Sequence, residues 1–326
     1  MIMTKKSFNN ANSTLSFWES FQLETLNQKI CRMVLGVHKK SSRLGTLGEL
    51  GRFPLFVKAL CNMLKYQAQI SLIGKMVNEI KTNPSPGLNT WWGRVEKIKD
   101  NLGIKYSTFS KIDTIGNNIK KQIKSKFEIF WLNEIKKVKI GADNKNHNKL
   151  RYYSTIKGCF KKEQYLDLVP NRAQRADLSR IRISSSRLAV ETMRYQRPKV
   201  AEENRYCRYC MPSGGDNNLE GYVDNEQHLL SSCGSFTLKR NCLFAKMDTI
   251  VSGFSKLSQE KQTAILLCPT SVITTKMTNK YIQILFKARK LLDEGVPTLN
   301  MGYESGVIVL NEFFDDHDND DSDTDD

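Results

Sequence analysis

Residues 115–135 read IGNNIKKQIKSKFEIFWLNEI, and an apolar side chain returns at every fourth position through this stretch. The recurring residues are Ile115, Ile119, Ile123, Phe127, Trp131 and Ile135. A repeat close to 3.6 residues gathers side chains on one face of an α-helix, whereas the side chains of a strand alternate with a period of two. The stretch therefore predicts a long amphipathic helix and a mainly α fold.

Lysines crowd the remaining surface of this predicted helix, at Lys120, Lys121, Lys124, Lys126, Lys136, Lys137 and Lys139. Lysines opposite an apolar stripe usually form a solvated face, so they identify no partner by themselves. A basic amphipathic helix can also lie on an anionic membrane, which is the weaker alternative.

Shorter helical patterns lie on both sides of this stretch. One consists of Leu23, Leu26, Ile30 and Val34 before Gly36, and another of Val57, Leu60, Cys61, Leu64 and Ala68 after Pro54. Further helices are expected at 91–103, 152–160, 236–252 and 276–293. Each apolar stripe is expected to face inward, which gives a multi-helix array.

Breaks in pattern and composition divide the chain into six segments. We expect a flexible N-terminus at 1–14, an N-terminal helical region at 15–110, a basic helical region at 111–200, a zinc knuckle at 201–235, C-terminal helices at 236–295 and a mostly disordered acidic tail at 296–326.

The charge of the 326-residue chain is strongly uneven. Its formal net charge is +16, but the last fifteen residues, EFFDDHDNDDSDTDD, hold nine acids and no lysine or arginine. The preceding residues therefore hold 50 basic and 25 acidic side chains. A folded body that basic is expected to bind a polyanion, most often RNA or DNA, or to contact its own acidic tail.

The sequence also suggests a compartment. The start, MIMTKKSFNN, lacks the apolar core of a signal peptide, and no apolar run reaches the roughly 18 residues that cross a bilayer. We therefore expect a nuclear or cytoplasmic protein, in which cysteines stay reduced and bind metals more readily than one another.

Cysteines cluster at one place in the chain. RYCRYC at 205–210 holds Cys207 and Cys210, and EQHLLSSC at 226–233 holds His228 and Cys233. A Cys-x-x-Cys turn presents two thiolates side by side, and a short helix from Asn225 could aim the other two ligands at the same point. The pattern predicts a closed Zn²⁺ site, and the alternatives are ordinary thiols or a disulfide.

An arginine-dense stretch precedes this cluster. Its basic residues are Arg172, Arg175, Arg180, Arg182, Arg187, Arg194, Arg197 and Lys199. Guanidinium groups bind phosphate well, and the nearby Tyr195, Tyr206 and Tyr209 could stack on unpaired bases. The alternative is that the arginines pair with neighbouring acids, such as Glu191, and that the tyrosines pack on the knuckle.

Several blocks, in order, resemble the C-terminal part of LINE-type (non-LTR) retrotransposon polyproteins. They are residues 31–55 (CRMVLGVHKKSSRLGTLGELGRFPL), LSRIRISSSRLAVETMRY at 178–195 with the two cysteine motifs, and LLCPTSVITTKMTNKYIQILFKARKLL at 266–292. In that family the Cys-Cys-His-Cys element is a zinc knuckle implicated in handling RNA or target DNA. The resemblance thus implies the same four ligands.

The polymerase and endonuclease motifs of such polyproteins are not found in this chain. Phe313, Asp315 and Asp316 follow the order of a polymerase motif, but no palm precedes them and the acidic run after them suits no strand. We therefore expect a non-catalytic, zinc-containing protein that binds RNA or single-stranded DNA, without a membrane or a small-molecule substrate. The alternatives are a protein-interaction module or a transposon relic without a function.

Overall fold

The computed structural model describes residues 22–72, 91–105, 112–137, 149–169, 171–198, 200–210 and 222–294. Throughout these ranges the regular elements are helices, and extended pairing is limited to two isolated bridges, Leu50 with Lys162 and Tyr206 with Val223. The predicted mainly α fold is confirmed. No helix in these ranges is both long enough and apolar enough to cross a bilayer.

The chain forms two compact units, each built around its own helices. Unit 1 comprises Met1–Asp167 and Ser179–Ser185, and unit 2 comprises Leu168–Leu178 and Ser186–Asp326. The short helix α10 (Tyr165–Leu168) and the helix α11 (Arg172–Arg182) therefore contain residues of both units.

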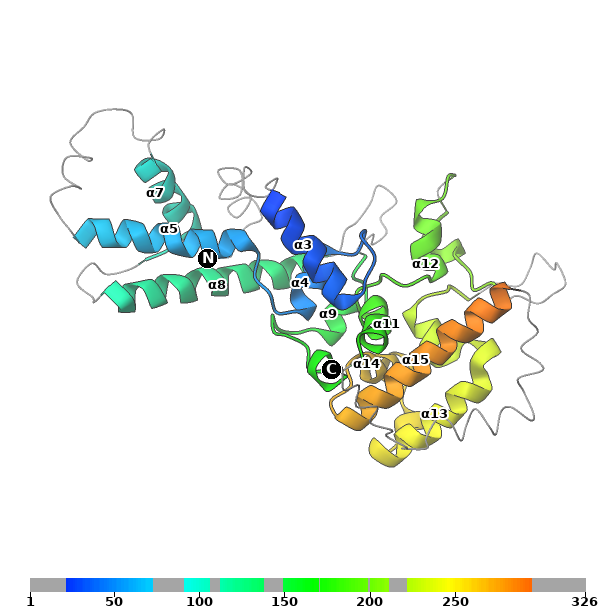
Figure 1. The fold of residues 1–326 in the computed structure, drawn as a ribbon. Helices are drawn as coiled ribbons and strands as arrows, with labels where there is room; N and C mark the ends of the chain where they lie inside the picture. Colours follow the sequence, from blue (N-terminus) through cyan, green and yellow to red (C-terminus); the bar gives the residue numbers. More distant parts are fainter. Residues whose placement is uncertain are drawn as a thin grey trace, which may run out of the picture. The chain divides into compact units, whose positions relative to one another are not determined.

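The helices of unit 1 are α3 (Gln22–Leu35), α4 (Arg43–Glu49), α5 (Leu55–Leu72), α7 (Trp91–Leu102), α8 (Ile112–Lys136) and α9 (Tyr153–Ile156). α5 runs alongside α8, and α7 packs against α5 (Figure 1). The glycines that were expected to end two of these helices do so: Gly36 and Gly103 both have a positive φ, which closes the last turn.

The stripe that predicted α8 forms the centre of unit 1. All six of its residues are buried, and Phe127 and Trp131 extend the apolar contacts into an aromatic cluster with Phe53 and Phe160. On α5 the predicted positions Val57, Leu60, Leu64 and Ala68 are buried, and Cys61 is half-buried.

The packing around Gly48 on α4 explains why one position of the block GTLGELG is glycine. A Cβ atom there would lie 2.5 Å from the Trp131 ring and 2.6 Å from the Tyr153 hydroxyl, closer than side chains approach. The Trp131 indole N–H donates to the Leu44 carbonyl at 2.9 Å. Only glycine allows α4 to pack this closely against these two rings.

Three of the four residues of α3 that were expected to face inward face solvent, and the fourth, Ile30, is half-buried. Leu23, Leu26 and Val34 are 54%, 51% and 46% exposed, whereas Glu24 and Gln28 are buried. The Glu24 carboxylate accepts a hydrogen bond from the Leu55 backbone N–H at 2.8 Å, and the Gln28 amide holds the same carboxylate. α3 thus packs through a carboxylate that caps the first turn of α5, which an apolar-periodicity argument cannot detect.

The main helices of unit 2 are α12 (Ala189–Thr192), α13 (Thr237–Ile250), α14 (Gln259–Leu267) and α15 (Val272–Asp293). α13 and α15 confirm the expected helices at 236–252 and 276–293, whereas α14 was not predicted. α15 begins with a capping box between Ser271 and Thr274 and buries Tyr281, Ile282 and Leu285. It lies beside α13 and carries Arg289 to the cysteine cluster (Figure 1).

Candidate metal centre

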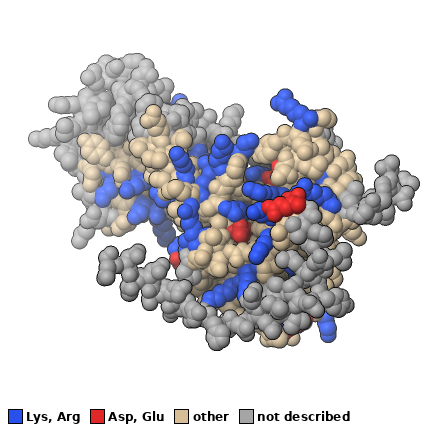
Figure 2. Space-filling view, turned by 45° about the vertical axis from the view of Figure 1, so that its right-hand side comes forward, with Lys and Arg blue, Asp and Glu red and all other residues tan. Residues whose placement is uncertain are grey.

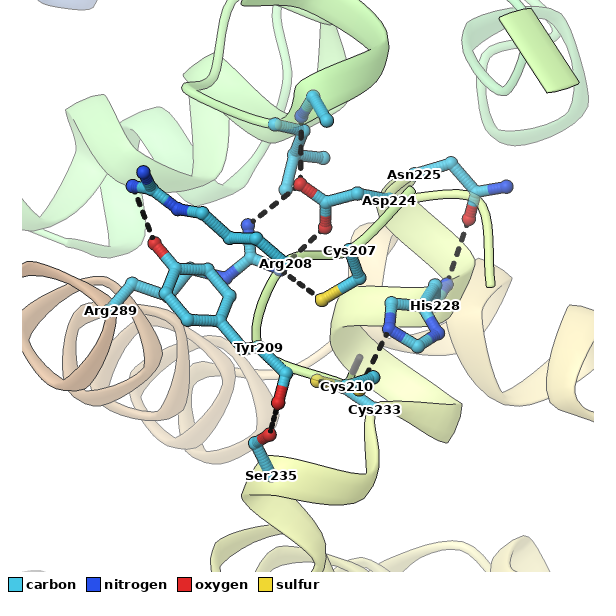
Figure 3. A network of polar contacts seen from close by, with 12 residues as sticks. Cys207, Arg208, Tyr209, Cys210, Asp224, Asn225, His228, Cys233, Ser235 and Arg289 are labelled. Atoms are coloured by element: carbon cyan, nitrogen blue, oxygen red, sulfur yellow. Dashed lines mark hydrogen bonds and ion pairs between the residues drawn. The ribbon is translucent and has the colours of Figure 1, made fainter. Parts of the chain in front are cut away.

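The four predicted ligands meet in unit 2. The Sγ atoms of Cys207, Cys210 and Cys233 and a ring nitrogen of His228 all lie within 4.8 Å of one another (Figure 3). Cys210 Sγ lies 3.4 Å from His228 Nε2 and 3.3 Å from Cys233 Sγ. A tetrahedron with metal–sulfur bonds of about 2.3 Å has edges of roughly 3.8 Å, so the cluster has the dimensions of a metal site.

A small hairpin positions the two cysteines of the first motif. Tyr206 forms a bridge with Val223, and the Cys207 N–H donates to the Tyr222 carbonyl at 2.8 Å. The chain then turns, and the Cys210 N–H donates to the Cys207 carbonyl at 3.2 Å. This turn puts both thiols on the same side of the hairpin, as the Cys-x-x-Cys spacing predicts.

A π-helical turn, His228–Ser232, positions the second pair of ligands. In an α-helix, residues five apart point about 140° away from each other around the axis, because each residue advances by roughly 100°. Here the Cys233 N–H instead donates to the His228 carbonyl at 2.7 Å, which brings these two residues together. The expected short helix is present, and its unusual winding is what accommodates the five-residue spacing.

The imidazole of His228 is oriented by its neighbours. Its Nε2 faces Cys210, and its Nδ1 lies 3.4 Å from the Ser232 hydroxyl. The backbone N–H of His228 donates to the Asn225 side chain at 2.8 Å. Contacts of this kind fix which ring nitrogen can bind a metal, as partners of ligating histidines commonly do.

A buried ion pair supports the cluster from the side of Cys207. Arg289 of α15 binds the Asp224 carboxylate at 2.5 and 3.1 Å and also donates to Cys207 Sγ at 3.8 Å (Figure 3). Asp224 in turn accepts the Ala189 N–H at 2.7 Å. The arginine compensates part of the negative charge that three thiolates would carry, and it ties α12 and α15 to the site.

The acidity of the thiols follows from these contacts. A hydrogen bond from the Cys233 thiol, with the help of His228 and Arg289, holds the pKa of Cys207 well below its ordinary value against the opposing effect of burial. The same hydrogen bond, together with burial, raises the pKa of Cys233. A thiolate is the form of cysteine that binds metals, and the surroundings of Cys207 favour this form.

The arrangement can hold a metal ion but offers no open position on it. Three sulfurs and one nitrogen complete a tetrahedral set, and the Cys207, His228 and Cys233 side chains are buried. Such closed sets stabilise structure, whereas a catalytic metal keeps a position for water or substrate. Elsewhere, burial raises the pKa of the Cys31 and Cys61 thiols, which favours their unreactive form.

Arg182, one of the predicted nucleic-acid contacts, is not on the surface. Its guanidinium is fully buried in unit 1, where it binds Glu49 at 2.9 Å and Glu163 at 2.7 Å. The same Glu49 carboxylate accepts the Tyr165 hydroxyl at 2.6 Å. Arg182 is therefore a core residue that phosphate cannot reach, and the partners that explain it lie far away in the sequence.

The other members of the set differ in their surroundings. Arg172, Arg187 and Arg197 are exposed, and Arg175 is half-buried. Arg180 donates to the Gly36 carbonyl at 2.9 Å, and Arg194 pairs with Glu191 at 3.5 Å, as the local-pairing alternative anticipated. Lys199 lies outside the described residues, as do Lys139 and the acidic tail.

The tyrosines near the cluster differ in their contacts and in their exposure to solvent. Tyr209 packs on the knuckle, where its hydroxyl donates to Asp293 at 2.5 Å and its ring lies 4.9 Å from the Arg289 guanidinium. Tyr195 is exposed, and Tyr206 is half-buried and donates to Asn204. Sequence reasoning missed Tyr222, whose ring stacks on His228. The available signal was an aromatic residue between the two cysteine motifs, six positions before His228.

Comparison of the chain with models of protein families, with curated proteins and with solved structures gives no match.

Proposed function

We propose that this chain is a zinc-containing, non-catalytic protein that binds RNA or single-stranded DNA. We further propose that it corresponds to the C-terminal region of a LINE-type retrotransposon polyprotein. The observation that carries the proposal is the convergence of Cys207, Cys210, His228 and Cys233 on one point. These are the ligands that the resemblance implies, and they come from two motifs, at 205–210 and 226–233, with fifteen residues between them.

The donor set favours zinc among the common metals. Thiolates are soft ligands that bind Zn²⁺ or iron–sulfur clusters, whereas Ca²⁺ and Mg²⁺ require oxygen ligands. Three thiolates with one imidazole form a common tetrahedral zinc set. Since the set leaves no position for water, the proposed metal stabilises the knuckle and takes no part in a reaction.

Charge supports nucleic acid as the partner. Lysine and arginine side chains are numerous on the face shown in Figure 2, and acidic side chains are few among the residues described there. Before its last fifteen residues, the chain holds twice as many basic as acidic side chains. Phosphate backbones neutralise such an excess and release their own counterions, which makes the binding favourable and dependent on salt.

A protein-interaction module is the second candidate, because α3 exposes an apolar stripe. Leu23, Leu26, Met33 and Val34 all lie on its surface. Contacts between apolar surfaces are weakened little by salt, whereas contacts with phosphate are weakened strongly. A protein partner retained in high salt would therefore favour this second candidate.

The test is the binding of a fluorescent, unstructured single-stranded RNA at several salt concentrations. If about six phosphates are contacted, the logarithm of the affinity is expected to fall with the logarithm of the salt concentration with a slope of about −4. The Arg187→Glu/Arg197→Glu variant is expected to bind at least about tenfold more weakly at low salt.

The matched control is the Lys120→Glu/Lys121→Glu variant, which changes the net charge by the same amount on the exposed side of α8. If both variants lose the same affinity, only the total charge matters and the arginine stretch is no binding surface. If the unmodified protein fails to bind RNA or single-stranded DNA at low salt, the proposed function is wrong.

A further inference from the structure

Tyr222 stacks on His228 and is also exposed to solvent. Its ring centroid lies 5.5 Å from that of His228, with the two planes only 13° apart. At the same time the residue is 67% exposed. One face of the phenol ring thus covers a metal ligand, while most of the side chain remains in solvent.

The backbone holds this ring in place. The Tyr222 carbonyl accepts the Cys207 N–H at 2.8 Å, and the next residue, Val223, forms the bridge with Tyr206. The imidazole beneath the ring is itself fixed by Cys210 and Ser232. An aromatic ring that is already ordered loses little conformational entropy when a second flat group stacks on it.

The turn between Cys207 and Cys210 supplies a cation. Arg208 follows Cys207, its side chain is 67% exposed, and its guanidinium binds the Asp293 carboxylate and lies 5.1 Å from the Tyr209 ring. A guanidinium that binds a carboxylate can bind a phosphate through the same N–H donors. Tyr222 thus offers a flat apolar ring. Arg208 offers a guanidinium on which a phosphate can replace the Asp293 carboxylate.

We infer that Tyr222 is a stacking platform for an unpaired base, and that Arg208 contacts the phosphate backbone of the same strand. The inference rests on the proposed function and adds the residues that would contact the nucleic acid at the knuckle. Any base can stack on an aromatic ring, so the platform serves single strands of varied sequence. A base paired within a duplex has no free face to offer.

The two contacts respond differently to salt, which allows them to be separated. Stacking transfers flat apolar surface out of water and releases no counterion, whereas an arginine–phosphate contact releases about one. Loss of Tyr222 is therefore expected to lower the affinity equally at all salt concentrations. Loss of Arg208 is expected to make the salt slope shallower by about 0.7.

The experiment measures binding of an unstructured RNA of about 12 nucleotides to the full chain, alongside an abasic strand of equal charge. Tyr222→Leu is expected to weaken RNA binding by about 5- to 150-fold and to leave abasic-strand binding unchanged. Tyr222→Phe keeps the ring and is expected to bind like the unmodified protein. Tyr66→Leu is the control, because Tyr66 is also exposed but lies on α5 in unit 1.

Leucine was chosen because it still covers His228 with an apolar side chain, and the metal content of each variant shows whether the cluster is intact. Unchanged RNA affinity in a metal-containing Tyr222→Leu variant would overturn the inference while leaving the proposed function standing. An equal loss for RNA and abasic strands would also overturn it. No binding by the unmodified protein would instead refute the proposed function itself.

Discussion

At the scale of single residues, Arg182 shows how burial changes the meaning of a charged side chain. Within its helix it is one arginine among several, but its guanidinium lies between Glu49 and Glu163 in the core of unit 1. Burial lowers the pKa of this arginine, and the two carboxylates raise it by more, so the group stays charged. Glu163 also binds the buried Lys157, so charges of both signs are balanced.

Arg182→Met is expected to lower the free energy of unfolding of unit 1 by about 3–5 kcal/mol, because it leaves Glu49 buried without its cation. The control is Lys120→Met, an exposed position on α8 of the same unit, where a change within about 0.5 kcal/mol is expected. Urea unfolding followed by tryptophan fluorescence provides the measurement, since all four tryptophans lie in unit 1. Equal stability of the two variants would contradict this account of the network.

The predictability of the site depends on how far apart in the sequence the interacting residues lie. The four candidate ligands fall in two short motifs with characteristic spacing, so the sequence alone predicted that they would lie together, as they do. The partnership of Asp224 with Arg289 spans 65 residues, and that of Glu49 with Arg182 spans 133. No local pattern encodes such pairs, and for this reason Arg182 was wrongly assigned to the surface.

At the scale of elements, apolar periodicity predicts the buried face of α8 but not that of α3. The stripe of α8 faces the core at every predicted position. In α3, Leu23, Leu26 and Val34 face solvent, because the buried side contains Glu24, which caps α5 and pairs with Arg43. A hydrogen-bonded carboxylate can decide which face of a short helix is buried, and the pattern of apolar residues does not reveal it.

The two helices should therefore respond differently to the same kind of truncation. Ile119→Ala on α8 is expected to lower the unfolding free energy of unit 1 by about 2–5 kcal/mol, since it leaves a cavity. Leu26→Ala on α3 is expected to change it by less than about 0.5 kcal/mol, since the side chain is half in water already. Comparable losses in both variants, measured by urea unfolding, would show that the apolar face of α3 is covered.

At the scale of the whole molecule, the candidate metal site belongs to one unit only. Its four candidate ligands, together with Asp224 and Arg289, lie in unit 2. Unit 1 has its own apolar core around α8 and contains no part of the cluster. The metal is thus expected to stabilise unit 2 and to leave the folding of unit 1 unaffected.

The most direct test of the central claim is the metal content of the purified 326-residue protein. We expect about one zinc ion per chain, absent from Cys210→Ser and retained in Cys159→Ser, whose cysteine is exposed in unit 1. In Cys210→Ser the helical circular dichroism should fall, whereas the tryptophan fluorescence of unit 1 should be unchanged. A metal-free chain whose unit 2 is nevertheless folded would contradict the account, because the four residues would then be ordinary buried side chains.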